Sequence, residues 1–317
     1  MADTASLRGL IVDLITPIRE DGSVDRAGLE RHLARVLPYV HGLLVCGPDA
    51  GGGEGLGQAQ RADALDAVMD RVQEALPLLV WITGRTQDET SGMIEVLEAR
   101  VEKRSYRGPV FWVDTPLIYH SNRGLPQHYG NLLSFTSRPV LLFNDPERVK
   151  RAGRPLKRAN IRTAVLKEIA HLEGVRGLVF RGAMDRARNY QKAVRFRSVF
   201  RLYDGDEAQF LSYPSRHGVL SPGANLAPRD WARITESSMD TASEQKSYPG
   251  HLRQVWESGR YLDALRAAYG ERPAHRIGAV LARTGVLASS PPLQDGSDDD
   301  EAADRLISLM ESRGDAR

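Results

Sequence analysis

Residues 140–148 read VLLFNDPER, an unbroken apolar run that ends in a polar turn. A run that is apolar at every position, rather than at alternate ones, is typical of a strand buried on both faces of a parallel sheet. Eight runs of this kind recur along the chain, most of them continuous in the same way. They lie at residues 10–15, 43–46, 78–82, 110–113, 140–143, 177–180, 199–203 and 218–220.

Segments with helical periodicity separate these runs, for example at residues 59–75, 88–103, 156–172 and 185–196. Eight strands that alternate with helices predict an α/β fold of the (β/α)8 TIM-barrel type. A doubly wound nucleotide-binding sheet would need fewer strands and a glycine fingerprint after the first of them.

The chain stays helical after the eighth run, at residues 229–235, 251–269, 273–283 and 302–312. We therefore expect residues 1–225 to form the barrel and residues 226–317 to form C-terminal helices packed on it, as one structural unit. The acidic run at residues 298–301 is expected to be the solvated first turn of the last helix, because carboxylates favour helix N-termini. An interaction tail is the alternative.

Composition narrows the classes of partner. No apolar run approaches the ~18 residues of a membrane span, and the first residues, MADTASLRG, lack the pattern of a signal peptide, so we expect a cytoplasmic protein without a membrane partner. The net charge is +2 and no basic stripe is present, which argues against nucleic acid as a binding partner. Cys46 is the single cysteine and no HxH or HExxH spacing occurs, so we predict neither a metal site nor a cofactor.

Several segments share the patterns of one known family. VLLFNDPER resembles the YNxPxR strand end of the dihydrodipicolinate synthase / N-acetylneuraminate lyase family, and GVRGLVFRG at residues 174–182 resembles its GxKE strand. TPLIYHSNRGLPQHY at residues 115–129 and GVLSPGANLAP at residues 218–228 also resemble family elements. The resemblance covers residues 7–310 and implies a class I aldolase-like barrel that forms a homo-oligomer, either a dimer or a tetramer.

The resemblance also implies that the family's reactive side chains have been replaced here. The lysine that forms a Schiff base with a keto acid corresponds to Val179, and the proton-relaying tyrosine corresponds to Phe143. Valine has no amine, and phenylalanine has no hydroxyl for acid–base work. A shift of the alignment cannot recover the lysine, because none occurs between Lys167 and Lys192.

Two further features differ from the family pattern. The loop that begins at Gly47 reads GPDAGGGEG and places Pro48 and Asp49 where the family has a pair of threonines that hold a substrate carboxylate. Leu117 and Ile118 replace the family's aromatic pair. An acidic side chain at residue 49 would repel a carboxylate such as that of pyruvate.

Two features of the family's site remain. Arg148 matches the arginine that binds a substrate carboxylate through a two-pronged fork, although it could equally stabilise a loop by ion pairing. Thr16 also matches, but shaping the first turn after a strand would explain it at least as well. We therefore take Arg148, Thr16, Gly47 and Asp49 as candidate substrate-binding residues.

New polar side chains occur at strand ends that face the predicted barrel interior. By strand alternation Arg181 shares the face of Val179, and Asp13 lies within the first strand. A buried carboxylate is costly unless it is paired, so we predict an ion pair between Asp13 and Arg181. This pair is either structural or part of a rebuilt site, in which Asp13, Asp49 or Asp114 acts as a base and Arg148 or Arg181 binds an anion.

Two hypotheses of function follow. In the first, the protein is a non-catalytic or regulatory relative of the family; in the second, it is a diverged lyase or aldolase acting on a small keto acid or another small anion. The state of the barrel interior discriminates between them. An interior filled by Phe143, Phe180 and Trp81 favours the first hypothesis, and an open polar interior favours the second.

Overall fold

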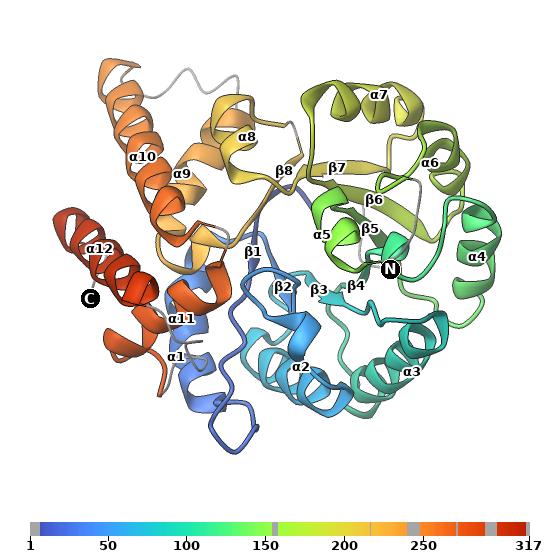
Figure 1. Ribbon diagram of the computed structural model, residues 1–317, viewed down its shortest axis with the longest axis horizontal. Coiled ribbons are helices and arrows are strands. Elements are labelled where there is room, and N and C mark those ends of the chain that lie inside the picture. Colours follow the sequence, from blue (N-terminus) through green and yellow to red (C-terminus); the bar gives the residue numbers. More distant parts are fainter. Residues whose placement is uncertain are drawn as a thin grey trace.

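Eight parallel strands close into a barrel in the computed structural model of the chain (Figure 1). The structure describes residues 7–153, 158–215, 217–239, 248–270, 272–288 and 297–314. The predicted (β/α)8 fold and the eight predicted strands are confirmed. The strands are β1 (Gly9–Asp13), β2 (Gly42–Val45), β3 (Leu78–Trp81), β4 (Val110–Asp114), β5 (Val140–Asn144), β6 (Val175–Phe180), β7 (Arg201–Asp204) and β8 (Gly218–Ser221).

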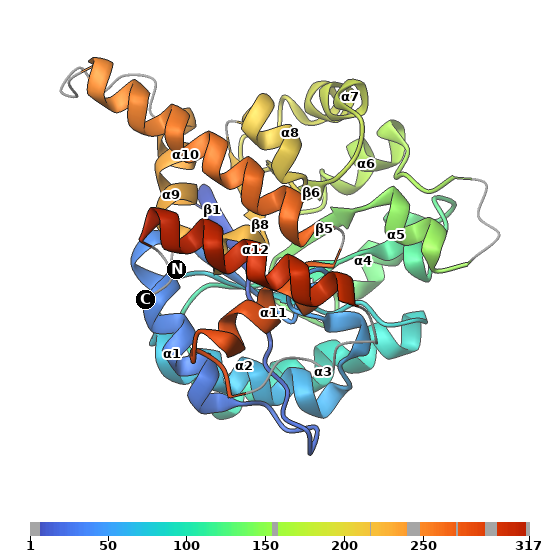
Figure 2. The same cartoon turned by 60° about the vertical axis from the view of Figure 1, so that its left-hand side comes forward.

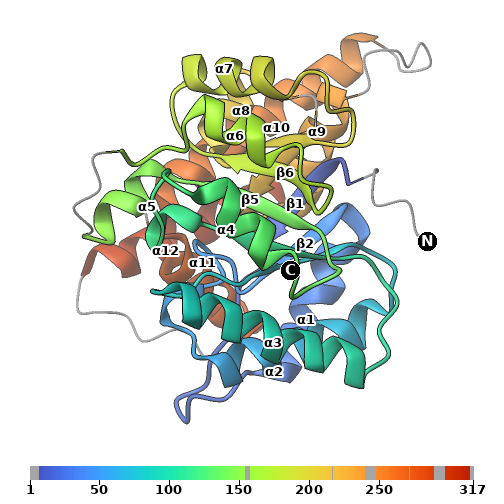
Figure 3. The same cartoon turned by 90° about the vertical axis from the view of Figure 1, so that its right-hand side faces the viewer.

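Helices follow the strands and surround the barrel (Figures 1 and 3). They are α1 (Arg26–Val36), α2 (Gln58–Val72), α3 (Gln87–Lys103), α4 (Leu125–Leu132), α5 (Pro146–Arg151), α6 (Thr163–Ile169), α7 (Met184–Val194) and α8 (Glu207–Ser212). The helix predicted at residues 156–172 is shorter than expected, and residues 156 and 157 lie outside the described part of the chain. Before α6 the backbone is held away from helical geometry at Ile161, whose amide donates to Asn144 and whose carbonyl accepts from Tyr190.

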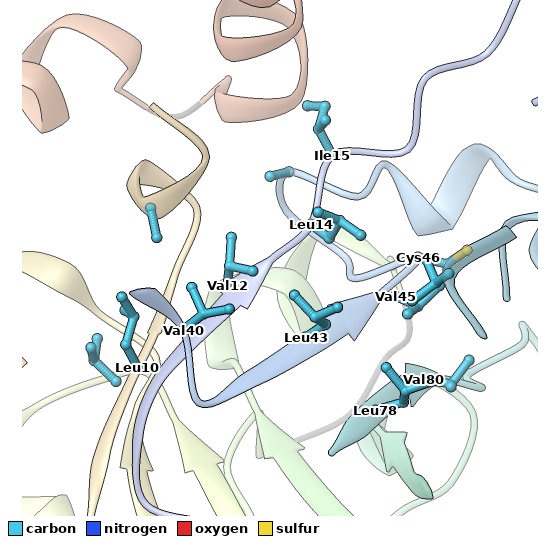
Figure 4. Packing of buried hydrophobic residues seen from close by; sticks show 14 of the residues in the cluster. Leu10, Val12, Leu14, Ile15, Val40, Leu43, Val45, Cys46, Leu78 and Val80 are labelled. Atoms are coloured by element: carbon cyan, nitrogen blue, oxygen red, sulfur yellow. The ribbon is translucent and has the colours of Figure 1, made fainter. Parts of the chain in front are cut away.

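Side chains of the strands form two apolar layers. The outer layer packs against the helices, and Figure 4 shows part of it on β1, β2 and β3. The inner layer fills the barrel and takes members from every strand but from no helix. The inner members are Leu7, Ile11, Leu44, Leu79, Trp81, Phe111, Val113, Leu141, Phe143, Val179, Tyr203 and Leu220.

The barrel interior is therefore filled with apolar side chains rather than open and polar. Trp81 and Phe143, two of the three residues considered as possible fillers of the interior, belong to this inner layer. Phe180 does not: it faces outward and packs edge-on against Tyr190, with the ring centroids 5.1 Å apart. The two residues occupy opposite layers because neighbouring positions of a strand point to opposite faces.

Asn225 joins the first strand to the last. Its side-chain amide donates to the carbonyl of Asp13 over 2.7 Å, and its Oδ1 accepts from the amide of Ile15 over 3.0 Å. His32 Nε2 lies 2.8 Å from the same oxygen. Burial lowers the pKa of His32 to about 4, so the imidazole is neutral. These contacts fasten the seam where β8 meets β1.

Four helices follow β8 and stack beside the barrel (Figure 2): α9 (Pro228–Met239), α10 (Tyr248–Tyr269), α11 (Pro273–Arg283) and α12 (Ser297–Arg313). The acidic run at residues 298–301 does begin a helix, as predicted. It is not fully solvated, because Asp299 is buried and pairs with Arg272 and Arg276, each over 2.9 Å. Packing of α12 on α11 thus turns one of its carboxylates inward.

In the described part of the chain, no helix combines the length and the apolar character that crossing a membrane requires. Residues 1–6, on which much of the expectation of a missing signal peptide rested, lie outside the described residues.

The inner layer should contribute strongly to stability. Phe143→Ala removes a fully buried ring and leaves a cavity in the closely packed barrel interior, so we expect the free energy of unfolding to fall by about 3–5 kcal/mol. Phe196→Ala is the matched control, because that ring is 83% exposed and should contribute less than about 0.5 kcal/mol. Urea unfolding followed by circular dichroism measures both. Equal losses would show that the inner layer is not packed as described.

Candidate functional site

Charged side chains from three strand ends meet at the mouth of the barrel. Both terminal nitrogens of Arg181 donate to the carboxylate of Asp49, Nη2 to Oδ2 over 2.6 Å and Nη1 to Oδ1 over 3.2 Å. Arg148 donates to the same Oδ1 over 2.6 Å and also contacts Glu54. Asp145 completes the group, 3.3 Å from Arg181. We call these five residues the mouth ion cluster.

Asp145 positions both arginines. Its Oδ1 caps the N-terminus of α5 by accepting from the amides of Glu147 and Arg148, each over 3.0 Å. Its Oδ2 faces Nη1 of Arg181 and lies 3.6 Å from Nε of Arg148. A helix cap and an ion pair thus use the two oxygens of one buried carboxylate.

The electrostatics of the cluster favour its charged form. Burial alone would raise the pKa of Asp49, but Arg181 and Arg148 outweigh it and hold that pKa below the ordinary value. The carboxylates in turn raise the pKa of both arginines against the effect of their burial. Burying charges is tolerable here because each one has an opposite partner within hydrogen-bond distance.

Asp13 has different partners from those predicted. Both residues are described, and the ion pair with Arg181 does not form: Asp13 instead accepts from the backbone amides of Asp49, Ala50 and Gly51 over 2.8–3.3 Å. The carboxylate thus holds the loop that carries Asp49. Gly47 makes room for it, because a Cβ there would lie 1.9 Å from Oδ1 of Asp13.

Asp114 does not face the barrel mouth, so its predicted role as a base there is wrong. Its neighbour Val113 belongs to the inner layer, which turns Asp114 outward. There it accepts from the hydroxyls of Thr83, Tyr119 and Tyr129 over 2.6–2.8 Å. Burial raises its pKa, and the three hydroxyl groups offset part of that effect.

The remaining candidates lie as follows. Val179 is 1% exposed and pairs in register with Phe143, so an apolar contact occupies the place that the resemblance assigns to lysine and tyrosine. Thr16 is buried beside the thiol of Cys46 rather than in the mouth ion cluster. Of the predicted binding residues, the structure brings Arg148 and Asp49 together with Arg181.

A second buried cluster was missed by the sequence analysis. Glu207 accepts from the hydroxyl of Ser221 over 2.5 Å, from the amide of Gly223 over 2.9 Å and from the hydroxyl of Tyr269. Burial raises the pKa of Glu207 and raises that of Tyr269 well above its ordinary value. No local motif signals this cluster, because Tyr269 comes from α10, 62 residues after Glu207.

Arg61 was also missed, and it anchors the other end of the loop that follows β2. Its guanidinium donates to the carbonyls of Gly53, Leu56, Trp81 and Thr83 over 2.7–3.2 Å. The loop is therefore fixed by Asp13 at its start and by Arg61 at its end.

A cleft of about 1220 Å³ lies above the mouth ion cluster. One wall comes from the end of α10 and the start of α11, with Arg266, Tyr269, Arg272 and His275. Its floor includes Asp49, and Arg148 and Arg181 also line it. Among the described residues, no group of three or more histidines, cysteines or carboxylates is placed to hold a metal ion.

The sequence model of the dihydrodipicolinate synthetase family matches residues 6–257. The chain belongs to this family. Relatives include the 4-hydroxy-tetrahydrodipicolinate synthases of Teredinibacter turnerae, 26% identical over 88% of this chain and 89% of the relative, and of Thiobacillus denitrificans, 27% identical over 72% and 73%.

Solved structures of family members share the fold. A monomeric dihydrodipicolinate synthase variant superposes with a TM-score of 0.80 at 21% identity, covering 99% of this chain and 100% of that one. The dihydrodipicolinate synthase of Thermotoga maritima gives a TM-score of 0.77 at 20% identity, covering 97% and 99%. The C-terminal helices are thus part of the architecture of this family member.

The stability of the site should depend on pH through Asp13. Burial, and then the charge of Asp49, raise the pKa of Asp13 from 3.8 to about 7. Between these values the folded protein holds a proton that the unfolded chain has released, so the free energy of unfolding falls as pH rises through this window. Asp13→Asn removes the titration while keeping an oxygen that accepts from the loop amides.

We therefore expect the stability of D13N relative to wild type to increase by on the order of 3 kcal/mol between about pH 5 and about pH 7.5. Urea unfolding of both proteins at several pH values measures the difference. If the two pH profiles run parallel, Asp13 does not titrate in this window.

Proposed function

We propose that this family member does not carry out lysine imine chemistry and is a non-catalytic relative with a structural or regulatory role. The observation that supports this best is the apolar contact between Val179 and Phe143, buried beneath an ion cluster in which each charged group has an oppositely charged partner. A keto acid at this place would meet neither an amine nor a hydroxyl group.

Neighbouring groups are poor substitutes for the lysine. Arg181 stays protonated, which makes it a very poor nucleophile, and both arms of its guanidinium are engaged. Lys150 is exposed and pairs with Glu147 over 2.6 Å. Within the described part of the chain, the residues that line the cleft include no lysine.

A regulatory role would be exerted through protein contacts, and we propose a homo-oligomer, dimer or tetramer, located in the cytoplasm. Pairing with an active relative is a further form of the same role. The proposal draws on the family's fold and on the resemblance of the sequence, and size-exclusion chromatography with light scattering would measure the oligomeric state.

The cleft favours one second candidate, a diverged lyase or aldolase that handles a small keto acid or another small anion without an imine. Its volume of about 1220 Å³ would accept such a ligand, and the Glu207–Tyr269 pair on its wall could exchange protons. This candidate predicts that wild-type protein consumes or releases a keto acid.

Reductive trapping tests the proposal directly. Wild-type protein incubated with pyruvate and borohydride should show no covalent adduct by intact mass, because none of the described residues that line the cleft is a lysine. A family member that carries the lysine is the positive control. A pyruvate adduct on this chain would contradict the proposal and would mean that another lysine has taken over.

A further inference from the structure

We propose that Arg148 and Arg181 form a binding site for a small carboxylate and that the chain's own Asp49 occupies this site. An external carboxylate binds only after the side chain of Asp49 leaves the arginine pair. The inference goes beyond the proposed function and does not depend on it, because carboxylate binding at two arginines requires no lysine.

The geometry around Asp49 is that of a bound carboxylate ligand. Arg181 reaches both of its oxygens, and Arg148 reaches one of them from a second direction, with three contacts of 2.6–3.2 Å. Two-pronged arginine–carboxylate pairs are strong and directional, and the rigid guanidinium fork suits this task better than lysine does. A free carboxylate in the same place would receive the same three hydrogen bonds.

The site opens onto the cleft. Arg148, Arg181 and Asp49 all line the cleft, so a ligand that enters it can reach the arginine pair. Without Asp49, Nη2 of each arginine would lose the acceptor that it has in this structure. Donors of buried charged groups that lack an acceptor are costly, and this cost favours a replacement carboxylate.

The loop that carries Asp49 does not depend on the Asp49 side chain for its position. Asp13 holds the backbone amides of residues 49–51, and Arg61 holds the carbonyls of Gly53 and Leu56. Substitution of the Asp49 side chain should therefore vacate the site and leave the loop in place.

Occupation by Asp49 makes the wild-type protein respond weakly to carboxylates. Because Asp49 belongs to the same chain, its carboxylate competes with an external carboxylate at an effective concentration on the order of millimolar or above. The effective concentration is higher still because the loop already holds Asp49 at the site. The apparent affinity for an external carboxylate is reduced by the fraction of molecules in which the site is free.

The test compares Asp49→Ala with Glu54→Ala. Both variants remove one carboxylate that contacts Arg148, but only D49A vacates the position between the two arginines. The probes are acetate and succinate, with chloride at equal ionic strength as the reference. Thermal unfolding and isothermal titration calorimetry measure stabilisation and affinity.

We expect D49A to bind acetate or succinate at least ten times more tightly than wild type and E54A do, and to be stabilised by them over chloride. The double variant D49A/R181A, which restores the net charge of wild type, should lose this response. A response of D49A no greater than that of E54A, or one that survives in D49A/R181A, overturns the proposal.

Asp49→Asn provides a second variant if D49A does not fold. It keeps the volume of the side chain and weakens its hold on the arginines, so carboxylates should stabilise it more than they stabilise wild type. No difference between D49N and wild type overturns the proposal. The trapping experiment with pyruvate reports on imine chemistry alone, so a failure of either inference is recognised separately.

Discussion

Closing eight parallel strands into a barrel creates an interior that must be filled, because each strand turns every second side chain inward. Apolar residues from all eight strands fill it here, up to the level of Phe143 and Val179. Inward-pointing polar groups therefore find partners at the ends of the barrel: the hydroxyl of Tyr203 donates to the carbonyl of Leu7, which precedes β1, and the charged groups lie where the strands end. The apolar filling thus forces the charges of the chain's site into one layer at the mouth.

Buried carboxylates in this layer and around it are satisfied by different kinds of donor. Asp49 accepts hydrogen bonds from two guanidinium groups and stays ionised. Asp114 accepts from three hydroxyl groups, and Glu207 accepts from two hydroxyl groups and one backbone amide. Among the described residues, Asp13 accepts from backbone amides alone, and Asp49 beside it is negatively charged. The partner, more than the depth of burial, decides which carboxylate can hold a charge at neutral pH.

The order of strands and most helices could be predicted, because unbroken apolar runs and helical periodicity are local signals. Alternation also predicted that Val179 and Arg181 share a face, and the same counting from Val113 would have turned Asp114 outward. The partners within the site could not be predicted. Arg148 meets Glu54 across 94 residues and Arg181 meets Asp49 across 132, distances at which sequence spacing carries no information on pairing.

The seam at Asn225 bears on how the chain is made. Its contacts with Ile15 and Asp13 span 210 and 212 residues. Strand β1 therefore cannot pair with β8 until most of the polypeptide has left the ribosome. During that time one edge of β1 has no partner strand, and open strand edges can pair with other chains. Until residue 225 has been synthesised, the chain cannot close the barrel, and the open edge of β1 can be protected only by another molecule. After that point the chain can close the barrel by itself.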